Sequence, residues 1–230
     1  MRGCIAYATT KGTEYLPRGI QKERAGKWHK RTLYYDVIGD CRTLTSKQVK
    51  RALNLAMTTW DLEINIVFKP VWTDGQMHKA DIRLDFKDAE DYDLFTKSPS
   101  VLAAAYYPEQ GEISGYIVFN NDYIWSMNGK GITGKKAKAQ GLIENAADDN
   151  ILRTYNIIHT LIHELGHMLG LNHDDHNDSN DVMDAFYNGK MELSEWDIYR
   201  ILLKYTRRIF SRWHHYGRLK KAIKRMKSRL

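Results

Sequence analysis

Residues 163–173 read His163-Glu-Leu-Gly-His167-Met-Leu-Gly170-Leu-Asn-His173, and this stretch predicts a metal site built on the end of a helix. His163 and His167 are four residues apart, so both imidazoles leave the same helical face and can reach one ion. Gly170 allows a left-handed turn out of the helix, after which His173 returns as a third ligand. Three neutral imidazoles and one open position are typical of a catalytic zinc ion, and Glu164 lies beside them as a candidate general base.

The segments around this motif predict an α+β domain, because strand patterns and one helix come first and further helices follow. In the first expected helix Val49, Leu53, Ala56 and Trp60 recur at spacings of four, three and four, which gives one apolar face. Expected strands are 32–38, 64–71, 80–86, 101–107 and 116–119, and expected helices are 46–62, 151–169 and 194–205, the first of them capped by Ser46. Residues 120–150 are rich in Gly, Asn and Lys and favour a long mobile loop.

Composition bounds the class of protein. The chain has 230 residues, 43% of them hydrophobic and 27% charged, which is enough apolar material for a core. Two cysteines exclude a disulfide framework, and no stretch has the 18 or more apolar residues of a membrane span. We divide the chain into an irregular N-terminal arm (1–26), a body (27–205) and a basic C-terminal tail (206–230).

With its downstream methionine, Met183 in Asp181-Val-Met-Asp-Ala-Phe-Tyr187, the histidine motif resembles that of the metzincin zinc endopeptidases. Further stretches resemble the matrixin branch, the matrix metalloproteinase family, in the same order along the chain: residues 27–38, 80–86, 101–108 and 193–201. The adamalysin branch is the alternative, because Asp174 after the third histidine is commoner there, although the disulfides of that branch are missing.

The resemblance implies a metzincin fold: a twisted mixed sheet with two long helices, a small irregular lower part and a C-terminal helix. It also implies hydrolysis of internal peptide bonds, with zinc on His163, His167 and His173 and with Glu164 as the base. An extended protein substrate is expected to pair with the edge strand at Leu102 and Ala103. Tyr187 is expected to form one face of a specificity pocket, and Met183 to form the structural turn below the metal.

Three departures from the family pattern change these expectations. Ala104 and Val118 stand where matrixins have histidines of a second, structural zinc, so we expect only the catalytic ion. The glycine-rich calcium loop is missing; residues 120–122 offer oxygens to calcium, but a polar turn is the simpler interpretation. Cys4 lacks the pattern around the family's latency cysteine and is interpreted as a free thiol.

The resemblance favours an exported protein, yet the N-terminus carries no visible secretory signal, so localisation stays open.

Charge is distributed unevenly. The net charge is +7, but the tail holds ten Lys and Arg and no acid, so the rest carries about −3. In the tail Leu219, Ile223, Met226 and Leu230 form an apolar stripe, as in a basic amphipathic helix. Such a helix binds an anionic membrane or polyanion, or packs its stripe on the body.

A monomer is expected. The competing functional hypothesis is a non-catalytic zinc protein whose tail docks an anionic partner, which the presence of Glu164 disfavours.

Overall fold

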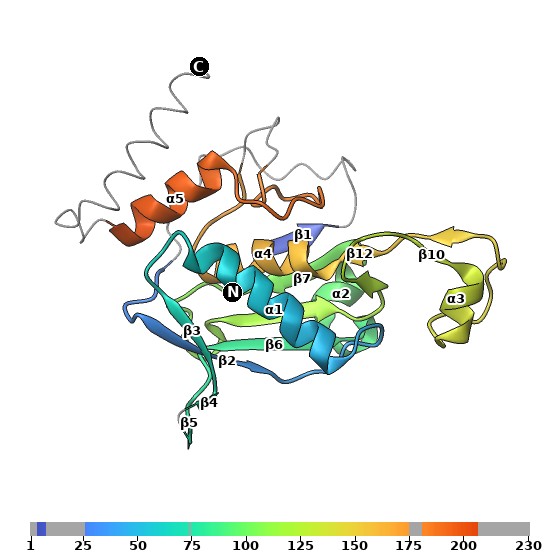
Figure 1. Cartoon of the computed structure of the whole chain (residues 1–230), viewed down its shortest axis with the longest axis horizontal. Helices are drawn as coiled ribbons and strands as arrows, with labels where there is room; N and C mark the ends of the chain where they lie inside the picture. Colours follow the sequence, from blue (N-terminus) through green and yellow to red (C-terminus); the bar gives the residue numbers. More distant parts are fainter. Residues whose placement is uncertain (1–3, 8–25, 74, 175–180, 207–230) are drawn as a thin grey trace, which may run out of the picture.

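A six-stranded mixed sheet organises the molecule (Figure 1). The computed structural model describes residues 4–7, 26–73, 75–174 and 181–206. The strand order is β1-β7-β8-β6-β2-β3. Strands β2, β3, β6 and β8 run parallel to one another, whereas β7 is antiparallel to β8 and β1 is antiparallel to β7. The expected fold class, a mixed sheet with helices, is confirmed, and the strands are β1 (Cys4–Tyr7), β2 (Thr32–Val37), β3 (Val67–Pro70), β6 (Ile82–Lys87), β7 (Val101–Ala105) and β8 (Tyr116–Asn120).

Helix α1 (Ser46–Asp61) connects the parallel strands β2 and β3, as a parallel crossover requires. The N-cap is Thr45, not the expected Ser46. Its hydroxyl accepts the Gln48 N–H, while the Gln48 side chain accepts the Thr45 N–H. This capping box satisfies two donors that the first turn leaves without partners. The predicted apolar face is confirmed, since its four members are all buried.

Helix α4 (Ile157–Met168) begins six residues later than the sequence pattern predicts. Asn156 is the reason, because its side chain accepts the N–H groups of Ile158 and His159 and so caps the helix there. The residues before it form the short strands β11 (Ile151–Leu152) and β12 (Tyr155–Asn156). Helix α4 packs on α1, and the Trp60 indole N–H donates to the Ile162 carbonyl at 2.9 Å, which ties the two helices together.

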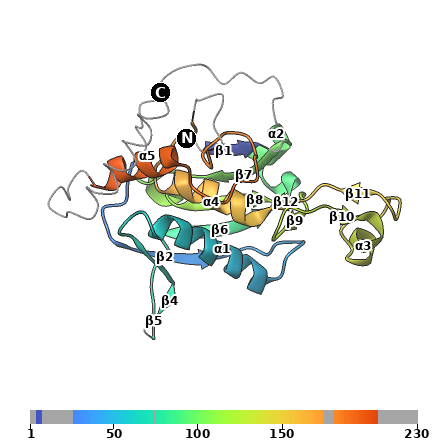
Figure 2. The same ribbon diagram turned by 45° about the horizontal axis from the view of Figure 1, so that its top comes forward.

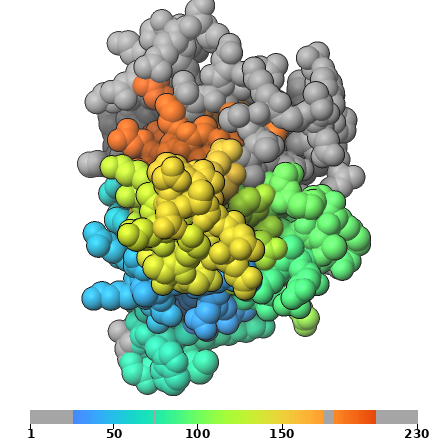
Figure 3. Space-filling view, turned by 90° about the vertical axis from the view of Figure 1, so that its right-hand side faces the viewer, coloured from blue at the N-terminus to red at the C-terminus, as the bar shows by residue number. Residues whose placement is uncertain are grey.

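The segment expected to be a long loop has secondary structure of its own. It contains β9 (Trp125–Ser126), β10 (Ile132–Thr133) and α3 (Gly134–Ala139) before β11 returns antiparallel to β10. Thr133 caps α3, since its hydroxyl accepts the Lys136 N–H. Figures 1 and 2 show β10, β11 and α3 projecting at the right of the molecule, and Figure 3, seen from that side, shows this segment in yellow-green to yellow facing the viewer. The sequence pattern misses these elements because each is too short to show a period.

The remaining elements are small, apart from the last helix. Helix α5 (Glu195–Thr206) lies close to its predicted bounds. The others are β4 (Trp72–Thr73), β5 (Gln76–Met77), η1 (Ala89–Asp91), α2 (Asp93–Lys97) and η2 (Gly111–Ile113). Among the helices that the structure describes, none combines the length and the apolar character needed to cross a bilayer. The amphipathic helix expected in the tail lies outside the described residues.

Strand β1 corrects two expectations. The N-terminal arm was expected to be irregular, yet residues 4–7 form a strand paired with β7. Strand β7 was expected to be the open edge of the sheet, but it lies between β1 and β8. An edge strand presents unpaired N–H and C=O groups, which an extended segment of the same chain can satisfy. Sequence alternation carries no information about such long-range pairing.

Candidate metal centre

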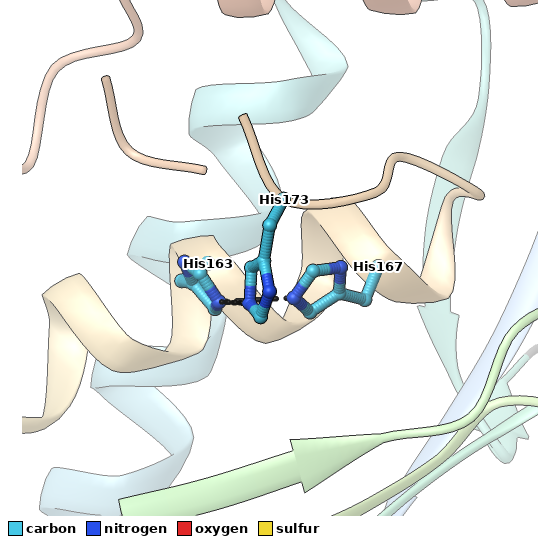
Figure 4. Close-up of side chains that lie close together, drawn as sticks. All are labelled: His163, His167 and His173. Atoms are coloured by element: carbon cyan, nitrogen blue, oxygen red, sulfur yellow. Dashed lines mark hydrogen bonds between the residues drawn. The ribbon is translucent and has the colours of Figure 1, made fainter. Parts of the chain in front are cut away.

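Three histidines converge at the C-terminal end of α4 (Figure 4). His163 and His167 come from the helix, and His173 from the segment that follows it. The Nε2 atom of His163 lies 2.9 Å from Nε2 of His167 and 3.2 Å from Nε2 of His173. Within the described parts of the chain, this is the one cluster of three or more His, Cys, Asp or Glu side chains whose ligand atoms lie within 4.8 Å of each other.

The other ring nitrogens are held by the backbone. Nδ1 of His163 lies 2.7 Å from the Val182 carbonyl oxygen, and Nδ1 of His167 lies 2.7 Å from the Leu171 carbonyl oxygen. A carbonyl only accepts, so each Nδ1 carries the proton and each Nε2 presents a lone pair. Hydrogen bonds of this kind fix the ring orientation and raise the basicity of a metal-binding imidazole.

The electrostatics keep these imidazoles neutral. Burial lowers the pKa of His163 and His167 well below the usual value, and the neighbouring histidines lower it further. Burial and the nearby Arg200 lower the pKa of His173 to about 4. Neutral imidazole is the form that binds a metal, so the cluster is ready for a cation near pH 7.

The donor set fits zinc. Tetrahedral zinc binds imidazole nitrogen at about 2.0–2.1 Å, which places neighbouring ligand atoms roughly 3.3 Å apart. The two Nε2 separations measured here, 2.9 and 3.2 Å, are close to that value. Three nitrogen ligands leave a fourth position for water or substrate, as in catalytic rather than structural zinc sites.

The turn after α4 brings His173 back to the helix. Gly170 has φ +95°, a left-handed conformation that a side chain would strain. The Leu171 N–H donates to the Gly166 carbonyl, and the Gly170 N–H donates to the His167 carbonyl. These two bonds form a Schellman motif, which ends the helix and reverses the chain within three residues. The role expected for Gly170 from the sequence is the one it has here.

Glu164 is fully buried on α4, next to His163 in sequence. A one-residue step turns the helix by about 100°, so the Glu164 side chain leaves α4 beside the face that carries His163 and His167. It is therefore placed next to the histidine cluster without belonging to it.

Met183 lies in a turn that packs against α4 at Gly166. It is fully buried, and a β-carbon added to Gly166 would meet its sulfur. The Met183 carbonyl accepts the Asp174 N–H at 2.9 Å, which joins this turn to the segment carrying His173. We refer to this turn, residues 181–184, as the methionine turn.

The methionine turn is held by Asp197, a residue that the sequence analysis did not identify. Its carboxylate on α5 accepts the Val182 N–H at 2.9 Å and the Ser194 N–H at 3.0 Å, and it lies 3.4 Å from the Met183 nitrogen. Burial raises the pKa of this carboxyl, and the hydrogen bonds from Ser194 and Val182 oppose that rise. A Ser-x-x-Asp helix start was the available signal, because Ser194 and Asp197 also cap α5 reciprocally.

Tyr187 is half-buried, and its hydroxyl accepts the N–H of Asn156, the N-cap of α4, at 2.9 Å. Its ring meets His159 edge to face at 4.7 Å and Tyr155 at 5.1 Å. His159 is buried, its Nδ1 contacts the Lys190 carbonyl, and burial lowers its pKa to about 4. His159 was not predicted from the sequence, although its spacing of four residues from His163 puts it on the same helical face.

Leu102 and Ala103 are buried on β7, a strand that α4 contacts. Ala103 pairs with Phe119 of β8 on one side and with Ala6 of β1 on the other. The backbone edge that was expected to receive substrate is therefore covered by the first strand of the same chain.

Two positions were considered for further ions, the second zinc of the family and calcium at residues 120–122. The first is apolar, and the second has backbone hydrogen bonds. Ala104 and Val118 are direct cross-strand partners, and with Phe95 and Val101 they form a small apolar cluster. Aliphatic side chains offer no metal ligand, and a single zinc ion stays a prediction for metal analysis. In the candidate calcium segment, an oxygen of each side chain accepts a backbone N–H, as in a polar turn: Asn120 from Asp122, Asn121 from Arg42 and Asp122 from Ala89.

Comparisons with known proteins agree with this geometry. Residues 27–206 match the matrixin family model. Karilysin from Tannerella forsythia is 28% identical over 187 residues, covering 76% of this chain and 34% of that protein. Matrix metalloproteinase-25 from Homo sapiens is 27% identical over 178 residues, covering 76% of this chain and 27% of that protein.

A putative matrix metalloproteinase from Spodoptera frugiperda ascovirus 1a is 31% identical over 152 residues, covering 62% of this chain and 34% of that protein. The chain thus spans about a third or less of these three relatives. Since the family model covers the histidine cluster, the methionine turn and all but the first strand of the sheet, the chain belongs to the matrixin family.

Proposed function

We propose that the protein is a zinc metalloendopeptidase that hydrolyses internal peptide bonds of extended polypeptides. The observation that carries this proposal is the convergence of three Nε2 atoms beside a buried glutamate. His163, His167 and His173 would hold the ion. Membership of the matrixin family supports the same activity.

Zinc and the residues of the chain would have separate roles in the reaction. Bound zinc would supply Lewis-acid polarisation of the scissile carbonyl and lower the pKa of water. The Glu164 carboxylate would accept a proton from the attacking water and return it to the leaving amine. Val182 and Leu171 would keep two imidazoles oriented through their carbonyls, and Asp197 would hold the turn that contains Val182.

For the substrate we propose an extended polypeptide that takes the place of β1 on β7 and pairs at Leu102 and Ala103 by main-chain hydrogen bonds. Tyr187 would border the pocket for one substrate side chain. The hydrogen bond from Asn156 and the ring contacts with His159 and Tyr155 support this role, because they hold the Tyr187 ring in one orientation. We propose zinc alone as cofactor, since an oxygen of each side chain in the candidate calcium segment (120–122) already accepts a backbone N–H.

A casein assay tests the activity. Zinc-loaded protein is expected to cleave denatured casein, to stop when a chelator removes the metal and to resume when zinc is restored. A zinc-loaded, folded protein that leaves casein intact would support the alternative, a non-catalytic zinc protein.

We make a second, separate proposal for the basic C-terminal tail (206–230). Its ten cations without an acid favour an anionic membrane or polyanion as partner, and the protein is expected to act as a monomer. Truncation after residue 210 should leave cleavage of a short neutral peptide within a few-fold but weaken binding to heparin-like polyanions. Added salt should weaken binding of the full chain through screening. Loss of peptide cleavage on truncation would show instead that the apolar stripe packs on the body.

A further inference from the structure

The third histidine of the cluster depends on the turn that carries it. His163 and His167 lie on α4, whereas His173 approaches them from the segment that follows the helix (Figure 4). The helix places its own side chains through its periodicity, but a ligand outside the helix is placed by the bonds that fix its backbone. The position of His173 is therefore the part of the metal centre that neighbouring elements can control.

Helix α5 reaches this turn with two side chains. Figures 1 and 2 both show α5 near α4. The Tyr205 hydroxyl donates to the Leu169 carbonyl at 3.0 Å, and Nη2 of Arg200 donates to the Asn172 carbonyl at 2.8 Å. The Tyr205 bond thus acts at the end of the helix. The Arg200 bond acts on the peptide group that joins Asn172 to His173, so it leads directly into the ligand.

Arg200 is only 7% exposed, although its guanidinium is always charged. Burial of a charge costs free energy unless hydrogen-bond partners compensate for it. The charge also lies near the cluster, because Arg200 is the second cause, after burial, of the lowered pKa of His173. A cation beside a metal site repels the metal ion, so charge alone would disfavour an arginine here. The hydrogen bond to the turn is what explains its place.

We propose that Arg200 is a positioning residue for the metal centre, which holds His173 within reach of the ion by binding the Asn172 carbonyl. This inference rests on the proposed function only through the zinc ion. The bond is charge-assisted and therefore stronger than the neutral bond from Tyr205. Without it the turn would still form at Gly170, but Nε2 of His173 would no longer be held 3.2 Å from Nε2 of His163. Zinc would then have two fixed ligands instead of three.

Competition with a chelator measures the zinc affinity of the full chain and tests this role. Arg200→Met removes the donor but keeps an apolar stem. It should weaken zinc binding roughly 10–100-fold, as the loss of a group that orients a metal ligand does. Arg200→Lys should stay within a few-fold of the wild type, because its ammonium also donates to a carbonyl. Ile201→Val is the matched control on α5: it removes one buried methyl group and no hydrogen bond, so stability should fall while zinc affinity stays unchanged.

The absorption spectrum of the cobalt(II)-substituted protein reports the ligand geometry. The visible bands of cobalt(II) are intense in four-coordinate sites and weaken when the coordination number rises, so they depend on the ligand set. The wild type and Ile201→Val should give the intense spectrum. Arg200→Met should give a spectrum that approaches that of His173→Ala, in which the third ligand is removed. A residue that only stabilised the fold would not change the bands of the folded protein.

Arg200→Gln covers the case in which Arg200→Met does not fold. Glutamine is neutral and polar, but its amide ends short of the Nη2 position, so it should lose zinc affinity as methionine does. Unchanged zinc affinity and cobalt spectrum in a folded Arg200→Met or Arg200→Gln variant would overturn the positioning role. An equal loss of affinity in Ile201→Val would overturn it as well.

The outcomes separate this inference from the proposed function. A wild type that binds zinc but leaves casein intact would contradict the proposed function, while weaker zinc binding by Arg200→Met would still support the role of Arg200. Casein cleavage by a wild type whose zinc affinity does not depend on Arg200 would leave the proposed function standing and overturn the inference. A folded wild type that binds no zinc would contradict both.

Discussion

The sulfur of Met183 occupies the space that a β-carbon on Gly166 would need. The contact joins the methionine turn to the last turn of α4, where Gly166 precedes His167. Trp60 of α1 also lies 3.0 Å from the same hypothetical β-carbon. The glycine in the histidine motif thus permits α1, α4 and the methionine turn to pack together next to His167.

Gly166→Ala should therefore destabilise the protein, although alanine is the better helix former by about 1 kcal/mol. Overpacking of a close-packed core typically costs about 1–3 kcal/mol. Denaturant unfolding of the metal-free protein would measure the effect. A double-mutant cycle with Met183→Ala supplies the control, since removing the sulfur should relieve the clash. Additive effects of the two substitutions would contradict the packing described above.

Asp197→Asn should lower the free energy of unfolding by roughly 1–3 kcal/mol, because the amide cannot replace a buried carboxylate that accepts several backbone N–H groups. Thermal unfolding measures the loss. Asp93→Asn is the matched control: Asp93 is exposed and pairs with Lys97 one helical turn away. The control should leave the melting temperature unchanged. Equal effects of the two substitutions would remove Asp197 from the support of the methionine turn.

Glu164→Ala should retain zinc, because Glu164 is not one of the three converging side chains, but turnover should fall roughly 10²–10⁴-fold. Peptide cleavage and metal content are measured on the same preparation. His163→Ala provides the contrast, since removal of a ligand should lower both. Near-normal cleavage by zinc-loaded Glu164→Ala would exclude the glutamate from the mechanism.

Metal analysis of purified protein should give about one zinc per chain. Ala104 and Val118 face each other across β7 and β8 as apolar partners, and the described residues contain no second histidine cluster. Ala104→Val, which changes the apolar cluster but no candidate ligand, should leave the zinc content unchanged. Two tightly bound zinc ions per chain would be incompatible with this arrangement.

The sequence by itself determined the local geometry of the site. Spacings of four residues within α4 place His163 and His167 on one face, and a glycine at 170 ends the helix and returns His173. Such features depend on helical periodicity and on the backbone freedom of one residue, so neighbours in sequence suffice to predict them. The major strands and helices were predicted for the same reason, with errors at their ends where caps such as Asn156 and Thr45 set the boundary.

Only the tertiary structure decided the surroundings of that site. Asp197 reaches the methionine turn from α5, Val182 holds His163 from 19 residues away, and Ala6 pairs with Ala103 across nearly a hundred residues. No periodic pattern encodes these contacts, because they arise when separate elements satisfy each other's unpaired backbone groups on folding. The motif thus specifies the metal-binding side chains, whereas long-range packing fixes their orientation. The same packing pairs strand β1 with β7 next to α4.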